Sequence, residues 1–434
     1  MYYYMNHPRP SIQGKLILLF PCAAAVLLCA FAPGLFGQEQ NNVSRLPAYS
    51  WVKPGPRQSD IAAIKNLAAT KPSETLPLWT FSVQSSRDNN NYTGVMVGRN
   101  PTIRGKGHGS ASVPTFIVPL IIITHEIETN VDFNTGNITT VPGDTTFDPT
   151  VADDACLASP NDVPLTLVQQ SPILQSATFH FGGTNVGTTQ YIDAFQRGNF
   201  WAVDDHNTYH VLLGPVQTLA PVVIDVPAAN GLALATTSLG QPPFCSPLGI
   251  VDINWFDAYI DQVVLPELAA QGVNPSNFPI FLVHNLVWAF APITDVFDCC
   301  FIGYHGINGL PIQTYSPVDF DSTGIIGNAE GTLGFMDTAI MAHEVGEWMN
   351  DPFGSNPTPP WGHTGQVSGC QNNLEVGDPL TGTIVPPVVM PNGFTYHLQE
   401  LTFFSWFYGA PSIGVNGWFS DNGTFLTDAG PPCQ

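Results

Sequence analysis

The chain has 434 residues, with 12 basic and 34 acidic side chains and a formal net charge of −22 at pH 7. Charged residues make up only 11% of the chain and hydrophobic residues 44%, so the sequence can bury a large core and is not a disordered acidic tail. The negative charge disfavours binding to nucleic-acid phosphates and to anionic lipids. We therefore expect a turn-rich globular protein without a nucleic-acid partner.

The N-terminal residues have the pattern of a secretory signal peptide. Two basic residues precede an apolar run over 16–32, which is short for a membrane span and ends in small and loop-forming residues. We predict a signal peptide over 1–37, cleaved after Gly37, with Ala32 as the alternative. No later run is long enough to cross a bilayer. The mature chain is therefore expected to be secreted, extracellular or periplasmic, with no membrane span.

The cysteines that follow this leader predict disulfide bonds. Six remain, and an even number in an oxidising compartment favours three disulfides, whose pairing the sequence leaves open. The adjacent Cys299 and Cys300 are expected to bond to separate partners. No Cys-x-x-Cys pair supports a zinc ribbon or a thioredoxin-like site. The six cysteines are Cys156, Cys245, Cys299, Cys300, Cys370 and Cys433.

Composition divides the mature chain into two parts. Residues 38–110 form a polar extension rich in Asn, Ser, Pro and Gly, with one expected strand over 78–83. The main domain is expected over 111–434, beginning with a nearly all-apolar, β-rich run over 115–124. Such a run predicts a strand that is buried on both faces of a sheet.

The main domain then alternates helical and strand patterns. An amphipathic helix over 253–271 is expected to end at Gly272. Short apolar runs follow it, and an edge strand among them could pair with an extended substrate through main-chain hydrogen bonds. The predicted class is α+β and zincin-like, with a mixed twisted sheet, an active-site helix, many loops and disulfides. The runs lie over 278–283, 301–306 and 311–315.

The stretch from Asp337 to Pro352 organises the functional hypothesis. It predicts a short helix that is capped by Asp337 and stopped before the proline. His343 and Glu347 are four residues apart and share one helical face, with Glu344 beside them. A surface ion pair is the simpler alternative, but the helix is mostly apolar and contains no Lys or Arg.

These residues match the needs of a catalytic zinc site. Such a site has three protein ligands and an open position for water, whose proton a neighbouring carboxylate accepts. We predict one zinc ion (Zn2+) per chain, held by His343, Glu347 and Glu375, with Glu344 as the general base. Asp378 is expected to orient His343 through its other ring nitrogen. Alternative third ligands are Asp351, His363, His397 and Asp378 itself.

Two further observations have plainer explanations. Glu375 and Asp378 lie in an acidic loop with Asn and Gly, which is also the composition of a surface turn. His305 lies between two glycines after an apolar run, which favours a core histidine or a substrate-side residue over a metal ligand.

The His-Glu-x-x-Glu helix, the later Glu-x-x-Asp and the Gly-Tyr-His-Gly stretch at 303–306 together resemble a group of secreted proteins. This group includes the plant Exordium or phosphate-induced family and its bacterial relatives, and the resemblance covers 253–378. It implies a zincin-like metallopeptidase variant. Zincins proper carry His where Glu347 stands, and the plant family is associated with cell-wall growth.

Three functions follow as hypotheses. The first is a secreted zinc metallopeptidase acting on a peptide or protein, with Glu344 as general base. The second is a non-catalytic extracellular or cell-wall-associated protein with a structural or vestigial metal site. The third is a carbohydrate-binding module, which rests only on the Asn-rich loops and the aromatic residues of 403–408, for which a core role is the better explanation.

Overall fold

The computed structural model describes most of the chain beyond the predicted signal peptide. No helix among the described residues is long and apolar enough to cross a membrane. The signal peptide predicted over 1–37 lies outside the described residues, and so does the side chain of Cys299. The signal peptide and the bonding of Cys299 and Cys300 to separate partners therefore remain predictions. The structure describes Lys53, 74–103, 109–132, 135, 137–152, 155–159, 161–235, 245–293, 299–324, 335–427 and 433.

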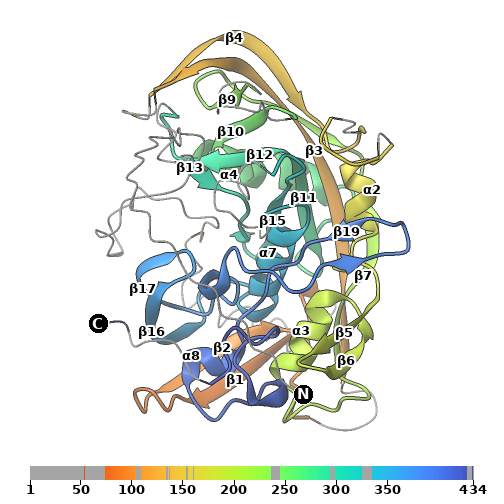
Figure 1. Cartoon of the computed structure of the whole chain (residues 1–434), viewed down its shortest axis with the longest axis vertical. Coiled ribbons are helices and arrows are strands. Elements are labelled where there is room, and N and C mark those ends of the chain that lie inside the picture. The colour runs from red at the N-terminus through yellow and green to blue at the C-terminus, as the bar shows by residue number, and fades with distance from the viewer. Residues whose placement is uncertain are drawn as a thin grey trace, which may run out of the picture.

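Among the described residues, a large mixed sheet of 11 strands forms the centre of the molecule. Strand β3 (Ser110–Val131) pairs in parallel with β11 (Phe278–His284) and antiparallel with β4 (Ile138–Phe147). Figure 1 shows β3 running along the long axis of the molecule. The mixed α/β class and the mixed sheet predicted from the sequence are therefore confirmed. The other strands of this sheet are β7 (His210–Thr218), β8 (Val222–Asp225), β9 (Gly231–Leu234), β10 (Leu248–Asp252), β12 (Leu286–Ala289), β13 (Cys299–Phe301), β14 (Gly306–Asn308) and β15 (Gln313–Phe320).

The apolar run in β3 is buried on both faces, as its composition predicts. Residues 115–120 are all buried. Successive side chains of a strand point to opposite faces, and here Phe116 and Val118 enter one core while Val113 and Ile117 enter another. The sheet thus separates two hydrophobic cores.

One of these cores lies under the predicted amphipathic helix. The helix is continuous through α4 (Ile253–Tyr259), a π-helical turn (Ile260–Val264) and α5 (Leu265–Ala269), and Phe256 and Leu268 pack in this core. Asp252 caps it by accepting a hydrogen bond from the backbone N–H of Asn254.

The other core contains α7 (Ala339–Asn350), the helix of the His-Glu-x-x-Glu motif. Trp348 of α7 stacks on Phe278 of β11 at 3.6 Å between ring centroids. Helix α3 (Tyr191–Asn199) and α2 (Pro164–Gln169) also contribute to this core.

The described part of the predicted N-terminal extension also belongs to this core. Strands β1 (Leu78–Gln84) and β2 (Asn91–Val97) form a hairpin, and Phe81 and Met96 are buried with the residues of α7. The Asn356 side chain accepts a hydrogen bond from the N–H of Val95 at 2.8 Å. The extension is therefore polar in composition, but its hairpin packs against the motif helix.

Smaller elements complete the fold. The Glu-x-x-Asp segment connects the antiparallel pair β16–β17 to the short 3-10 helix η4, which begins at Asp378. The Cys370–Cys433 disulfide joins β17 to the C-terminal end. A second disulfide joins Cys156 and Cys245. The remaining elements are β5 (Ala177–Phe181), β6 (Thr184–Thr189), β16 (Pro357–Thr364), β17 (Val367–Asn373), η4 (Asp378–Leu380), β18 (Val388–Val389), β19 (Thr395–Tyr396), α8 (Phe404–Tyr408) and η5 (Val415–Gly417).

Candidate metal centre

Helix α7 positions the three motif residues in the interior. All twelve of its residues are buried, so the surface ion pair weighed from the sequence is not what the structure contains. The predicted cap is also corrected. Thr338 is the N-cap residue, and Asp337 lies before it with a positive φ of 42° and receives hydrogen bonds from the main-chain N–H and ring of His397 at 3.0 and 2.6 Å.

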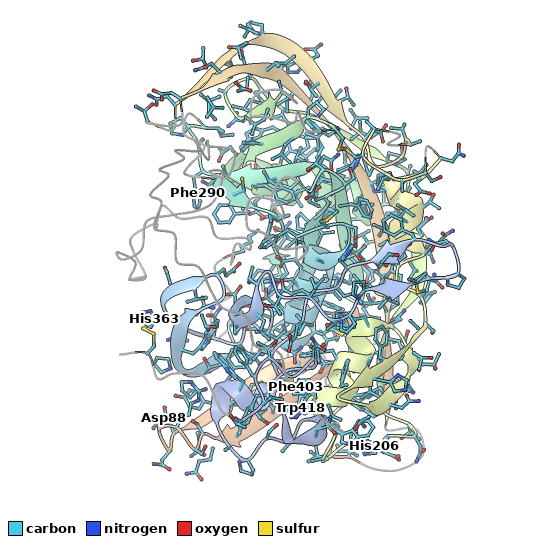
Figure 2. The ribbon with its side chains drawn as sticks, in the orientation of Figure 1. Asp88, His206, Phe290, His363, Phe403 and Trp418 are labelled. Atoms are coloured by element: carbon cyan, nitrogen blue, oxygen red, sulfur yellow. A yellow bond between two sulfur atoms is a disulfide. The ribbon has the colours of Figure 1, made fainter. Side chains whose placement is uncertain are left out.

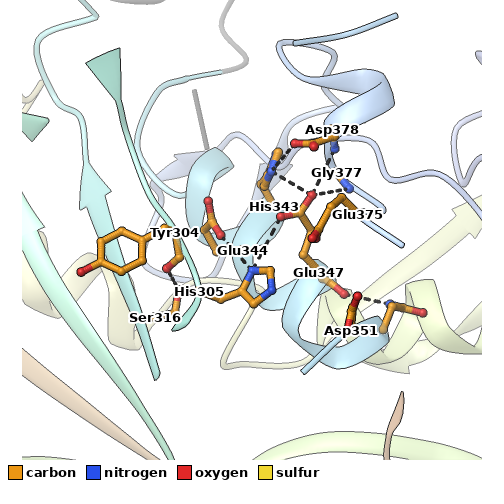
Figure 3. Close-up of polar contacts among 12 residues, drawn as sticks. Tyr304, His305, Ser316, His343, Glu344, Glu347, Asp351, Glu375, Gly377 and Asp378 are labelled. Atoms are coloured by element: carbon orange, nitrogen blue, oxygen red, sulfur yellow. Dashed lines mark hydrogen bonds and ion pairs between the residues drawn. The ribbon is translucent and has the colours of Figure 1, made fainter. Parts of the chain in front are cut away.

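The ring of His343 is fixed by Gln399, which sequence reasoning did not identify. The Gln399 amide donates to the carbonyl of Gly377 at 2.7 Å, so its Oε1 faces Nδ1 of His343 at 3.0 Å. Because this oxygen only accepts, Nδ1 carries the proton in neutral His343 and Nε2 has a free lone pair. Nε2 then points at the carboxylates of Glu347 and Asp378, as Figure 3 shows.

The ligand atoms around Nε2 lie close together. Nε2 of His343 is 3.1 Å from Oε1 of Glu347 and 3.5 Å from Oδ1 of Asp378, without the alignment of a hydrogen bond. The expected role of Asp378 is therefore corrected. It does not contact the other ring nitrogen of His343, where Gln399 lies, but faces the same nitrogen as Glu347.

Surrounding polar groups hold both carboxylates. Oε1 of Glu347 accepts the main-chain N–H groups of Gly377 and Asp378 at 3.1 and 3.2 Å. Gln366 donates to Oδ1 of Asp378, and Gln371 donates to Oδ2 at 2.7 Å. These donors orient the oxygens that face His343 before any ligand binds.

Gly377 allows the loop to approach the helix. A Cβ at this position would lie 2.6 Å from both Cγ and Nδ1 of His343. No side chain fits there without displacing the ring, so the glycine in the Glu-x-x-Asp motif is explained by a close contact between backbone and imidazole.

His305 and Glu344 form a second contact on the other side of Glu347. Nδ1 of His305 is 3.5 Å from Oε2 of Glu344 and 3.8 Å from Oε2 of Glu347 (Figure 3). Within the described part of the chain, the ring nitrogens of His305, the oxygens of Glu344 and Oε2 of Glu347 form no hydrogen bond. The sequence suggested a core or substrate-side role for His305, and the structure places it at the cluster itself.

The predicted third ligand, Glu375, lies beside this cluster. It is fully buried, its Oε1 accepts from Asn373 at 2.6 Å, and its Oε2 has no partner. Its oxygens are not among the ligand atoms that lie within 4.8 Å of one another around His343 or His305. Asp378, which the sequence suggested as a rival ligand, does contribute an oxygen to the group around His343.

The other rivals do not belong to the group of ligand atoms around Nε2 of His343. His397 is paired with Asp337, and the Asp351 carboxylate accepts the N–H groups of Ser355 and Asn356. His363 is exposed at the edge of the molecule (Figure 2), close to Cys370 and Cys433, whose sulfur atoms are bonded to each other and cannot ligate a metal as thiolates.

The cluster is buried and rich in negative charge. Seven ionisable side chains, each at most 4% exposed, meet here, and in the described part of the chain no Lys or Arg forms an ion pair with any of them. Burial without a cation is costly for carboxylates. The seven are His305, His343, Glu344, Glu347, Asp351, Glu375 and Asp378.

The pKa values reflect this shortage of positive charge. Burial raises the pKa of Glu347 to about 7, although the nearby His343 lowers it in part. Burial also raises the pKa of Glu375 well above its usual range, and the charge of Glu347 adds to the effect. Burial opposes protonation of His343, but the carboxylates of Glu347 and Asp378 outweigh it and raise the pKa of the ring.

Comparison of the chain with models of known protein families, with curated proteins and with solved structures finds no match. The site is therefore defined by its own geometry. The chain is a mixed α/β protein with disulfides and a buried cluster of histidines and carboxylates whose spacing suits a metal ion.

Proposed function

We propose that this chain is a secreted, zinc-dependent peptidase with a zincin-like fold. In this proposal His343, Glu347 and Asp378 hold the zinc ion, and Glu344 is the general base. The observation that carries it is the free Nε2 of His343, buried and facing two carboxylate oxygens at 3.1 and 3.5 Å.

The distances suit a zinc ion. Zinc binds nitrogen and oxygen ligands at about 2.0–2.2 Å, so two ligands of a tetrahedral site lie roughly 3.3 Å apart. The separations of 3.1 and 3.5 Å from Nε2 of His343 lie on either side of this value. Three protein ligands leave a fourth position for water or substrate.

The remaining groups are arranged for hydrolysis. A bound zinc ion would supply Lewis-acid activation of water and of a substrate carbonyl. Glu344 follows His343 on α7, and neither of its oxygens is engaged in a hydrogen bond, so it can accept a proton from attacking water. Because Glu344 is fully buried, bulk solvent does not compete for its carboxylate.

The sheet offers a place for an extended peptide. Strand β14 lies at the end of the described sheet, beside β15, and begins directly after His305. A peptide that adds to this edge by main-chain hydrogen bonds would therefore run next to the cluster. Peptide or protein is accordingly the substrate class we propose, with cell-wall material as the alternative implied by the family resemblance.

One observation favours the second hypothesis, a non-catalytic extracellular or cell-wall-associated protein with a structural metal. Glu344, His343 and Glu347 are fully buried, and a substrate carbonyl must reach Glu344 for cleavage. Catalysis therefore requires an opening motion around α7, whereas a structural metal does not.

Metal analysis and peptide cleavage by the purified secreted protein test the proposal. We expect chelator-sensitive cleavage, and we expect Glu344→Gln to retain zinc at His343 but to lose about 100-fold or more of the activity. Bound zinc without cleavage across a broad peptide library would favour the structural metal. Freshly secreted protein without zinc would contradict both functions.

A further inference from the structure

A second set of ligand atoms shares Glu347 with the proposed zinc site. His305, Glu344 and Glu347 present one nitrogen and two carboxylate oxygens that lie within 4.8 Å of one another, and all three side chains are buried. The zinc site proposed above uses Oε1 of Glu347, while this second set uses Oε2. A carboxylate whose two oxygens face different ligand sets has the geometry of a bridge between two metal ions.

The second set is the less satisfied of the two. Both ring nitrogens of His305 and both oxygens of Glu344 are buried, and they form no hydrogen bond with any residue that the structure describes. Buried polar groups rarely remain without partners, because each one left so destabilises the folded state. A cation bound to His305 Nδ1 would engage the unpartnered oxygens of Glu344 and Glu347 at once.

The backbone directs Glu344 toward this position. A Cβ at Gly303 would lie 2.9 Å from Cγ and 3.0 Å from Oε1 of Glu344, so the glycine lets the 303 segment pack directly on this side chain. Oε1 therefore faces the backbone, and Oε2 faces His305 at 3.5 Å.

The charge of the cluster agrees with two cations. Five buried carboxylates surround two histidines, which carry no charge when neutral. When all five carboxylates are ionised, one divalent ion leaves three of their negative charges uncompensated, and two ions leave one. Two-metal sites hold their ions about 3.5–4 Å apart, a separation that a bridging carboxylate spans.

We propose that His305, Glu344 and Oε2 of Glu347 form a second divalent-cation site, bridged to the zinc site by Glu347, and that its occupation inhibits hydrolysis. Inhibition follows because Glu344 would be held as a ligand and could not accept the proton of water. The inhibitory effect rests on the proposed peptidase function, but the second binding site does not.

Metal stoichiometry tests the site without reference to activity. The metal-free full chain is equilibrated with Zn2+, separated from free ion and analysed by mass spectrometry. We expect two equivalents in the wild type and one in His305→Ala. His397→Gln is the matched control, because His397 pairs with Asp337 outside the cluster, and it is expected to retain two. The thermal unfolding of each variant verifies that it is folded, and His305→Gln replaces His305→Ala if the latter is not.

Electron paramagnetic resonance of the Mn2+-loaded chain tests whether the two ions are neighbours. A spin-coupled pair is expected in the wild type and an isolated ion in His305→Ala. One equivalent in both proteins, with no coupling, would overturn the second site and leave the zinc site of the proposed peptidase intact. Two uncoupled equivalents would overturn the bridge. No bound metal in either protein would overturn both sites.

Peptide cleavage during the same titration tests inhibition. The first equivalent of Zn2+ should activate the wild type, and the second should reduce the rate about 100-fold or more, the usual contribution of a general base. His305→Ala should show no such decline at excess Zn2+. A wild-type rate that is unchanged when the second equivalent binds would overturn the inhibitory role alone. If no cleavage occurs at any ratio, the peptidase proposal and with it the inhibitory role are overturned, while the stoichiometry still decides the second site.

Discussion

Two acidic clusters in this molecule, one partly buried and one fully buried, satisfy their charges differently. Asp257 and Asp261 lie near Lys53, whose Nζ is 2.9 and 2.7 Å from their oxygens, and the hydroxyl of Tyr315 donates to Asp257 at 2.5 Å. The cluster around His343 has more carboxylates, is more deeply buried, and has no Lys or Arg partner among the described residues. The chain supplies its own cation to the first cluster. In the proposed function, a metal ion supplies the positive charge that the second cluster lacks.

The same contrast separates the two sides of Glu347. On the His343 side, Gln399, Gln366 and two main-chain N–H groups orient the ligand atoms. On the His305 side, no hydrogen bond from a described residue orients the Glu344 carboxylate or the His305 ring. Outer hydrogen bonds raise metal affinity by fixing ligand geometry. The His343 side is therefore expected to bind its ion more tightly than the His305 side.

Removal of zinc by a chelator should produce the largest change in stability, and this change should depend on the His343 cluster and not on the Lys53 cluster. With zinc at about a thousand times its Kd, binding stabilises the folded state by roughly 4 kcal/mol, which a strong chelator removes. Thermal unfolding with and without chelator measures this. The Lys53 cluster needs no metal, so Lys53→Met should show the same chelator-induced decrease. If chelation leaves the Tm unchanged, the cluster does not depend on a metal for stability.

Gly377→Ala should disturb the His343 side through steric contact alone. The added methyl would lie 2.6 Å from the imidazole, and overpacking of this kind costs about 1–3 kcal/mol. Displacement of the ring should also weaken zinc binding, measured by competition with a chromophoric chelator. Gly393→Ala is not a matched control, because Gly393 has a positive φ of 84°.

A suitable control for this change is Ser368→Ala, which alters an exposed residue of β17 and should leave zinc affinity unchanged. Wild-type affinity in Gly377→Ala would show that His343 can move without loss of the site.

Gln399→Leu should weaken zinc binding about 10- to 100-fold, the usual effect of removing an outer hydrogen-bond partner of a histidine ligand. The change frees the His343 ring to rotate and removes the acceptor of its Nδ1 proton. Gln399→Glu restores an acceptor and should recover much of the affinity. Equal affinity in the leucine variant and the wild type would argue that Nε2 of His343 is not a ligand.

Lys53→Met should destabilise the first cluster by about 1–2 kcal/mol, because it leaves the Asp257 and Asp261 carboxylates without their cation in a partly buried position. Lys53→Arg retains the charge and should recover part of the loss. Chemical denaturation measures both. If Lys53→Met leaves the free energy of unfolding unchanged, solvent already compensates the charges of these carboxylates. The contrast between the Lys53 cluster and the candidate metal centre would then be weaker.

The pH dependence of the metal-free protein should be the most gradual effect, at most about 1.4 kcal/mol per pH unit for each proton. Burial raises the pKa of Glu347 from 4.5 to about 7, so the folded state keeps a proton that the unfolded state has lost. Stability should therefore fall as pH rises from about 4.5 to 7. His343, with a raised pKa, acts in the same direction.

Zinc should reverse this trend, because binding requires deprotonated ligands and strengthens as pH rises. Denaturation of metal-free and zinc-loaded protein between pH 4.5 and 8 measures the difference. A metal-free protein that becomes more stable over this range would contradict the pKa shift of Glu347.

Local patterns in the sequence predicted the elements well where a single period dominates. The apolar run in β3, the amphipathic helix after Asp252 and the motif helix before Pro352 all lie where their patterns place them. The cap was placed one residue early because Asp337 instead pairs with His397, 60 positions later.

By itself the sequence determined that His343 and Glu347 share a face, because the helical repeat sets the direction of side chains four residues apart. It did not decide which distant groups meet them. Asp378 rather than Glu375 faces Nε2, Gln399 holds Nδ1, and His305 reaches Glu344. These contacts join residues 30 or more positions apart, and they depend on how loops without a repeating pattern pack against α7. Close approaches at Gly303 and Gly377 decide that packing, and only the tertiary structure shows them.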